Sequence, residues 1–261
     1  MDFFYFNKLS ELHNNFNILF CKTDYLKDEF KYIESIDNDV VLITGNSDYS
    51  ITDNEINLAP KNIKKWFAQN ALSNDEKIIP IPLGIENKIP SLRFGHGIGY
   101  YDRVNIKESL LSENIFRIPE NFIYANFNVN TNYSERIKYK QLSLEIDFID
   151  WDEPNLPLND FFKKILDYKM ILCPIGNGID THRLWEVIYS NRIPIIVKAG
   201  DYKIYELYDK LPIIILDDKE QLRNKDFLEN KYEEIKNKNW DKNIITTSYW
   251  VDLIKSYGCA K

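Results

Sequence analysis

Residues 172–198 read LCPIGNGIDTHRLWEVIYSNRIPIIVK, and this stretch decides the fold. An apolar strand over residues 170–173 leads into a loop with two glycines, a short helix and a second apolar strand over residues 193–197. Pro174 ends the first strand, because proline has no N–H group to donate to a strand ladder. The order strand, loop, helix, strand predicts a parallel sheet, in which ligands bind beyond the carboxyl ends of the strands.

The loop and the start of the helix have the residue types of a ligand-binding turn. We expect Gly176 and Gly178 to adopt positive φ and to let a ligand approach the backbone. Asp180 or Thr181 is expected to cap the helix that follows.

Arg183 and Glu186 lie three residues apart on that helix, so they share its polar face. An arginine in the first helical turn, beside free backbone N–H groups, suits a phosphate. A carboxylate one turn later suits sugar hydroxyls, as acidic residues do for ribose in dinucleotide-binding folds. The spacing fits a nucleotide-sugar site, and it fits equally a surface ion pair on an ordinary helix.

The segment CPIGNGIDTHRLWEVIYSNRIPIIV resembles the donor-site segment of exostosin-like glycosyltransferases. Those proteins carry a cysteine–proline, a Gly/Asp loop, an Arg-x-x-Glu helix and an Ile-Pro strand in this order. The resemblance implies a GT-B architecture, with two Rossmann-like α/β domains and an abbreviated acceptor-side domain first. It implies that Arg183 contacts the phosphates of a UDP- or GDP-sugar, that Glu186 contacts the ribose, and that the sugar passes to a glycan or glycolipid hydroxyl.

Strand and helix patterns alternate along the chain, which predicts parallel sheets with helices on both faces. We place a domain boundary near residue 115, giving domains 1–115 and 116–261, and the resemblance implies that the last helix packs back on the first domain. The expected strands are 17–21, 40–44, 78–83, 122–129, 145–149, 170–173, 193–197 and 212–216. The expected helices are 24–35, 61–71, 106–112, 134–144, 158–168, the one after residue 181, and two more that end the chain.

Further donor contacts are expected from the loop that opens the second domain. Asn126 and Arg136 could hydrogen-bond the donor phosphates, although an Asn-rich loop before a helix also serves turns and caps. Within the quoted stretch, the remaining donor-site candidates are Asn177, Gly178, Asp180, Thr181 and His182.

Direct displacement at the anomeric carbon needs a general base for the acceptor hydroxyl. Asp48 follows the strand VVLITG and would face the cleft, although an Asx turn explains the residue equally well. Glu86 and His96, each in a glycine-containing loop, are the alternatives. Tyr49 and Trp66 are acceptor-side candidates, since sugars stack on aromatic faces, while an aromatic at helical spacing is more often a core residue.

Two other functions compete with this one. Asp150-Trp151-Asp152 follows the strand 145–149 and is placed for a hard cation, as in metal-dependent glycosyltransferases. We favour a mechanism that requires no metal and no cofactor, because Arg183 and a helix N-terminus can balance the negative charge of the donor diphosphate. The short first half also fits a non-catalytic nucleotide- or glycan-binding subunit of a glycan-assembly complex.

The charge of the chain limits which classes of binding partner we expect. A net charge of −7 argues against a nucleic-acid partner, because phosphate binding needs a basic surface. Local basic stretches such as 61–65 still allow a peripheral contact with a membrane.

Three widely spaced cysteines show no zinc spacing and no disulfide framework. No signal peptide and no membrane-spanning apolar run is evident, so a cytoplasmic protein is expected. The sequence does not indicate the oligomeric state.

Overall fold

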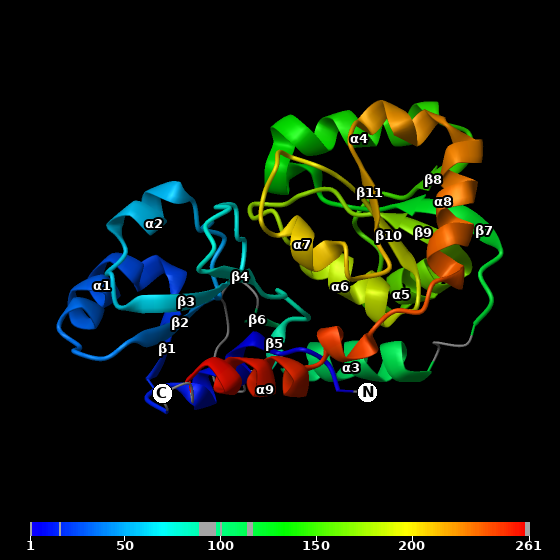
Figure 1. Cartoon of the computed structure of the whole chain (residues 1–261). Coiled ribbons are helices and arrows are strands. Elements are labelled where there is room, and N and C mark those ends of the chain that lie inside the picture. The colour runs from blue at the N-terminus through cyan, green and yellow to red at the C-terminus, as the bar shows by residue number, and fades with distance from the viewer. Residues whose placement is uncertain (1, 16, 89–97, 100, 114–116, 259–261) are drawn as a thin grey trace. The chain divides into compact units, whose positions relative to one another are not determined.

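A computed structural model describes residues 2–15, 17–88, 98–99, 101–113 and 117–258 (Figure 1). The chain is α/β and folds into two compact units, each with its own parallel sheet. The first unit comprises Met1–Tyr100, Asp201–Lys210 and Asp241–Lys261, and the second comprises Tyr101–Gly200 and Leu211–Trp240. The division falls earlier than residue 115, so the helix before that position belongs to the second unit.

The first unit is built on a four-stranded parallel sheet with the order β1-β2-β3-β4. Its strands are β1 (Ile18–Lys22), β2 (Val40–Gly45), β3 (Ile63–Ala68) and β4 (Ile78–Pro80). Strands β5 (Asn87–Lys88) and β6 (Ile98–Gly99) form a separate parallel pair. The helices are α1 (Leu26–Glu34), α2 (Asp53–Leu58), α7 (Tyr205–Tyr208) and α9 (Thr247–Gly258), with short 3-10 helices at Phe6–Leu12, Thr23–Tyr25 and Lys242–Ile245.

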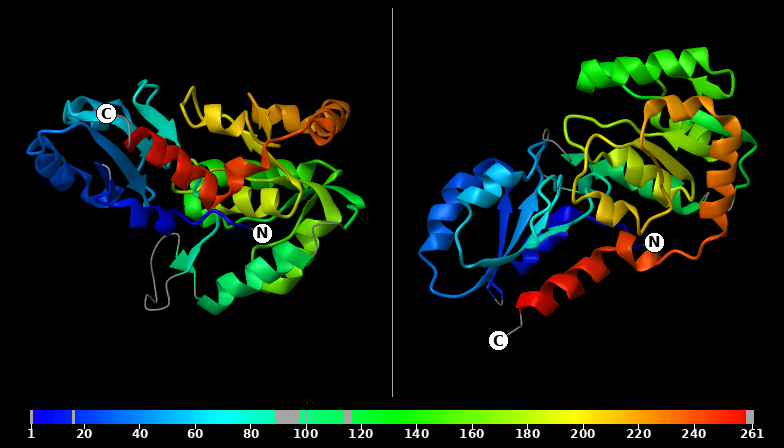
Figure 2. Two further views of the ribbon diagram at one scale, coloured as in Figure 1. Left: turned by 60° about the horizontal axis from the view of Figure 1, so that its bottom comes forward. Right: turned by 45° about the horizontal axis from the view of Figure 1, so that its top comes forward.

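Both faces of this sheet are buried. Helix α1 packs on one face, where Phe30 meets Trp66 edge to face at 5.7 Å between ring centroids. The C-terminal helix α9 lies against the 3-10 helix at Phe6–Leu12 and against β2 (Figure 2). The Oγ1 atom of Thr247 accepts a hydrogen bond from the amide of Tyr5, which ties the two ends of the chain together.

The helix predicted over residues 61–71 is wrong, because Ile63–Ala68 forms the inner strand β3. Trp66 points to the α1 face and donates to Thr44 Oγ1 at 2.8 Å, while Phe67 on the other face contacts Tyr257 of α9. A parallel strand buried on both faces reads as a continuous apolar run rather than an alternation. In Ile63–Ala68 the apolar run is interrupted by Lys64 and Lys65, so the segment resembles an amphipathic helix.

The second unit has a five-stranded parallel sheet with the order β11-β10-β9-β7-β8. Its strands are β7 (Asn121–Ala125), β8 (Ile149–Trp151), β9 (Tyr168–Leu172), β10 (Ile193–Val197) and β11 (Ile214–Leu216). The chain runs from β7 outward to β8, then returns to the other side of β7 as β9. The strand order therefore reverses between β7 and β9, and ligands bind open α/β sheets at this kind of switch point.

Helices cover both faces of the second sheet (Figure 1). Helices α4 and α8 share a core with the side chains of one face, including Ile123, Met170 and Ile195. Helices α5 and α6 lie on the opposite face and contact β9 and β10. The helices of this unit are α3 (Tyr101–Glu113), α4 (Tyr133–Glu145), α5 (Leu158–Asp167), α6 (His182–Tyr189) and α8 (Lys225–Asn237), with 3-10 helices at Val129–Asn132 and Lys219–Arg223.

Within the described ranges, no helix is both long and apolar enough to cross a bilayer.

The strand predicted over residues 145–149 lies later in the chain, where Ile149–Trp151 forms β8. Consequently Asp150 belongs to a strand rather than to the turn that follows one.

Candidate functional site

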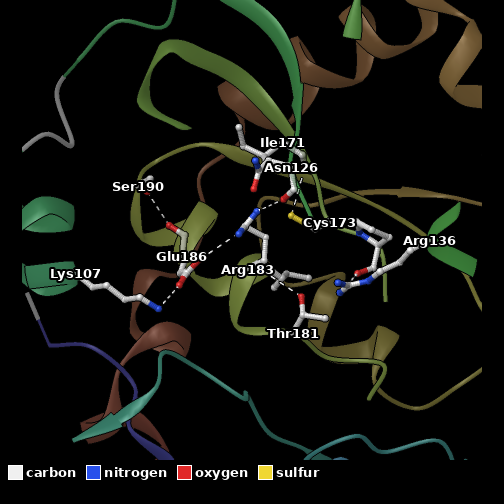
Figure 3. Close-up of polar contacts among 11 residues, drawn as sticks. Lys107, Asn126, Arg136, Ile171, Cys173, Thr181, Arg183, Glu186 and Ser190 are labelled. Carbon is white, nitrogen blue, oxygen red and sulfur yellow. Dashed lines mark hydrogen bonds and ion pairs between the residues drawn. The ribbon is translucent and has the colours of Figure 1, made fainter. Parts of the chain in front are cut away.

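The polar residues of the second unit gather where β7 and β9 end, at the switch point of the sheet (Figure 3). Asn126 directly follows β7, and the loop 173–181 connects β9 to α6. Arg136 reaches this loop from α4, and Lys107 reaches α6 from α3. Together with Arg183 and Glu186 of α6, these side chains form what we call the switch-point site.

Arg136 holds the loop after β9 in place. Its Nε donates to the carbonyl of Ile175 at 2.8 Å, and its two Nη atoms donate to the carbonyls of Asn128 and Pro174 at 2.9 and 3.3 Å. Burial, together with a smaller effect from the positive charge of Arg183, lowers the pKa of Arg136 to about 10. Arg136 stays protonated at neutral pH. We call its three hydrogen bonds to backbone carbonyls the clamp, and its positive charge also acts on the site.

The glycines of this loop act differently from our prediction. Within the described residues, positive φ among glycines occurs only at Gly84 and Gly200, so the positive φ expected at Gly176 and Gly178 is wrong. A Cβ on Gly176 would lie 3.3 Å from Nη2 of Arg136 and 3.5 Å from the methyl carbon of Thr181. Gly176 is needed because the clamp passes close to the backbone, rather than for its conformation.

Helix α6 starts as predicted, with Thr181 as its N-cap. The Thr181 hydroxyl accepts from the amide of Leu184 at 3.4 Å. Asp180 is buried and accepts from the indole N–H of Trp185 with both carboxylate oxygens at 2.9 Å, and from the amide of Thr181 at 2.8 Å. Asp180 therefore fixes the start of α6, and its contact with the donor stays a prediction.

Arg183 projects from the first turn of α6 across the end of β7. Its Nη1 donates to the carbonyl of Asn126, and its Nε lies 3.2 Å from Glu186 Oε2. One face of the guanidinium stacks on Phe161 of α5, with 4.0 Å between the guanidinium carbon and the ring centroid. A quarter of the side chain is exposed, and in the described part of the chain Nη2 has no hydrogen-bond partner.

Glu186 is buried between two cations. Its Oε1 lies 2.6 Å from Nζ of Lys107, and its Oε2 pairs with Arg183. Burial alone would raise the pKa of Glu186, but the charges of Lys107 and Arg183, with a smaller contribution from His182, hold it well below its ordinary 4.5. The carboxylate is therefore ionised at neutral pH.

Three cations and two carboxylates thus surround this end of the sheet. The carboxylate of Asp180 is bound to Trp185 and that of Glu186 to Lys107 and Arg183. Among the described residues, Arg136 donates to carbonyl oxygens and lies over the ring of Phe127, and it forms no ion pair. An arrangement of this kind favours an anion next to the exposed part of Arg183.

The other donor-site candidates lie around this centre. The Asn126 side chain is buried and donates to the carbonyls of Asp152 and Glu153 at 3.1 and 3.0 Å, so its amide group anchors the loop after β8. Asn177 is exposed in the loop, Gly178 is buried, and His182 is half-buried at the start of α6.

The base and acceptor candidates belong to the first unit. Asp48 is half-buried two residues after Asn46, whose φ is 54°, and Glu86 is half-buried before β5. Tyr49 is 66% exposed. Trp66 is fully buried in the core, so its ring is not exposed for a sugar to stack on. His96 lies outside the described residues.

Asp150 and Asp152 are both engaged by tyrosines. The hydroxyl of Tyr168 donates to Asp150 at 2.7 Å, and that of Tyr124 donates to Asp152 at 3.0 Å. Lys164 lies 3.2 Å from Asp152. No group of three or more potential metal-ligating His, Cys, Asp or Glu side chains occurs among the described residues.

Lys107 is the site residue that sequence reasoning missed. The sequence pattern places it in a helix of the first domain, and a single lysine in an amphipathic helix predicts a solvated side chain.

The comparison with protein-family models gave no match, and the search of curated proteins found no significant similarity. The resemblance to exostosin-like glycosyltransferases therefore rests on the residues quoted above.

Proposed function

We propose that this protein is a glycosyltransferase that moves a sugar from a UDP- or GDP-sugar to a hydroxyl group of a glycan or glycolipid, without a metal ion. The observation that carries the proposal is the position of Arg183. Its side chain is partly exposed and lies in the first turn of α6, where the strand order reverses between β7 and β9. Helix N-termini and arginines both favour phosphate, and this edge of the sheet is where such ligands bind.

Three charged residues of the switch-point site have a direct role in this proposal. Arg183 offers Nη2 to the diphosphate, while its Nη1 and Nε stay fixed by Asn126 and Glu186. Arg136 adds long-range positive charge. Glu186 accepts from the ribose hydroxyls, since a carboxylate oxygen that already accepts one hydrogen bond has a further lone pair. The leaving diphosphate would gain negative charge as the glycosidic bond breaks, and Arg183 would stabilise it there.

The acceptor hydroxyl needs a base, which we assign to Asp48, with Glu86 and His96 as alternatives. A GT-B architecture with the acceptor bound by the first unit is part of the proposal and comes from the family resemblance. Tyr49, whose ring is exposed, keeps its proposed place among the acceptor contacts. Metal independence is supported by Asp150 and Asp152, because both carboxylates already accept from tyrosine hydroxyls.

Calorimetric titration with UDP, GDP, UDP-glucose and GDP-mannose tests the proposal. We expect at least one nucleotide to bind in the absence of metal, and the matching sugar nucleotide to be hydrolysed or transferred. Failure of every nucleotide to bind to folded protein would remove the enzyme function. Nucleotide binding with no transfer or hydrolysis of any sugar would instead favour the non-catalytic subunit.

A further inference from the structure

We propose that Lys107 is a positioning residue of the donor site, which keeps Glu186 charged and aligned for the ribose of a nucleoside diphosphate sugar. This inference rests on the proposed function and extends it to a residue in α3, outside the quoted stretch.

The first support is the burial of the pair. Lys107 and Glu186 are 2.6 Å apart, and their side chains are only 4% and 7% exposed. The pair Lys138–Glu135 on α4 has almost the same length, 2.7 Å, but its side chains are 47% and 38% exposed. An exposed pair contributes little, whereas a buried charge that loses its partner is strongly unfavourable. Lys107 and Glu186 therefore constrain each other in a way that the surface pair does not.

The second support is how the carboxylate divides its oxygens. Oε1 faces Lys107, and Oε2 faces Nε of Arg183 (Figure 3). Since Nη1 of Arg183 is fixed by the carbonyl of Asn126, the guanidinium has two anchors, and one of them is Glu186. Lys107 thus fixes the carboxylate, and the carboxylate orients the guanidinium that we assign to the diphosphate.

The third support is electrostatic. Among the described residues, the titratable groups that act on Glu186 are Lys107 of α3, His182 and Arg183 of α6, and the Cys173 thiol after β9. Burial raises the pKa of Cys173 to about 12, so this thiol is neutral and contributes no charge. Without Lys107, burial would push Glu186 towards the neutral acid. A neutral acid neither orients Arg183 by charge nor accepts as many hydrogen bonds from a ribose.

The test is the pH dependence of donor affinity. UDP-glucose and GDP-mannose suit it, because their diphosphate groups do not titrate near neutral pH. For the wild type and Lys107→Arg we expect an affinity that is nearly constant between about pH 5 and pH 8. For Lys107→Met we expect an affinity that is at least about tenfold weaker at the acidic end, as Glu186 takes up a proton. Lys138→Met, which breaks the exposed pair, is the matched control and should behave as the wild type.

A double-mutant comparison separates positioning from general loss of structure. In the Glu186→Gln background, adding Lys107→Met leaves no buried unpaired charge on either residue. If Lys107 acts through Glu186, this second change costs no further donor affinity, also in the case that Lys107→Met alone fails to fold. An equal loss of affinity in both backgrounds, or a pH-independent affinity in folded Lys107→Met, overturns the positioning role. If the wild type binds no nucleotide, the proposed function itself fails, and the donor role of Lys107 fails with it.

Discussion

Nζ of Lys107 lies 2.6 Å from Oε1 of Glu186, although the two residues are 79 positions apart in the sequence. Arg183 completes the group from one helical turn before Glu186, so that a single buried carboxylate is shared by two cations. This relationship connects α3 to α6 beside the switch point of the second sheet, and it makes both the stability and the proposed donor site sensitive to the charge of Glu186.

Stability should depend on the ionisation of Glu186 at acid pH. Its pKa is lower in the folded protein than the ordinary 4.5, so its ionised form stabilises the fold above that value. This contribution is lost as pH falls from about 4.5 towards the lower folded pKa. Urea unfolding of the wild type should therefore show a falling free energy of unfolding in this window, with a smaller slope in Glu186→Gln. The exposed control Glu135→Gln should leave the slope unchanged, and equal slopes in all three proteins would contradict the buried ion pair.

Arg183→Ala should weaken nucleotide binding. The substitution removes a charged donor, a loss that commonly costs about 1.5–3 kcal/mol, or on the order of ten- to a hundredfold in affinity. Calorimetry with UDP and GDP measures the change. The control is Arg223→Ala, because Arg223 also pairs with a glutamate three residues away but lies on the surface. Unchanged affinity in folded Arg183→Ala would move the phosphate site elsewhere.

Gly176→Ala should destabilise the second unit through Arg136. The new methyl group would lie 3.3 Å from Nη2 of a guanidinium that three backbone carbonyls hold in place. Overpacking of this kind typically costs about 1–3 kcal/mol. Thermal unfolding of Gly176→Ala measures the cost. In an Arg136→Lys background the thinner side chain should make the same substitution less costly, and identical costs in both backgrounds would rule out this contact as the cause.

Transfer should proceed in the presence of EDTA. Asp150 and Asp152 accept from Tyr168 and Tyr124, and Asp152→Asn should keep most of the turnover because it leaves Arg183 in place. Steady-state turnover with and without EDTA is the measurement. Activity that EDTA abolishes and Mn²⁺ restores, with an inactive Asp150→Ala, would establish the metal-dependent alternative.

Asp48→Asn should leave donor affinity intact and lower turnover by roughly 10²–10⁴, the usual contribution of a general base. The comparison with Glu86→Gln and His96→Ala assigns the base, since the catalytic residue alone should show this separation of turnover from binding. If none of the three variants loses turnover, a retaining mechanism without a protein base becomes the better account.

Local patterns were sufficient for most of the fold. Short apolar runs with helices between them predicted a parallel α/β chain, which the structure confirms. The order of elements in the stretch 172–198 was predicted correctly, with β9, the cap at Thr181, α6 and β10 in sequence, although the φ angles expected of its glycines were not. These features depend on neighbours in the sequence, such as the proline after β9 and the threonine before α6, so they can be inferred without tertiary contacts.

The prediction failed where burial from a distant element determined the outcome. The segment Ile63–Ala68 is a strand because α1 and α9 bury its two faces, and α9 lies at the other end of the chain. The glycine at 176 is required by the guanidinium of Arg136, which comes from another helix. Neither neighbour can be identified from the pattern around these positions.

The sequence by itself determined the α/β class, the order of elements around α6, and the presence of an arginine and a glutamate on one helical face. Only the tertiary structure decided what that pair does, because it placed Lys107 against Glu186, Phe161 under Arg183, and the carbonyl of Asn126 within reach of the guanidinium. The physical reason is that charge and burial are properties of the space around a group, and the three residues that create this space come from three different elements of the chain.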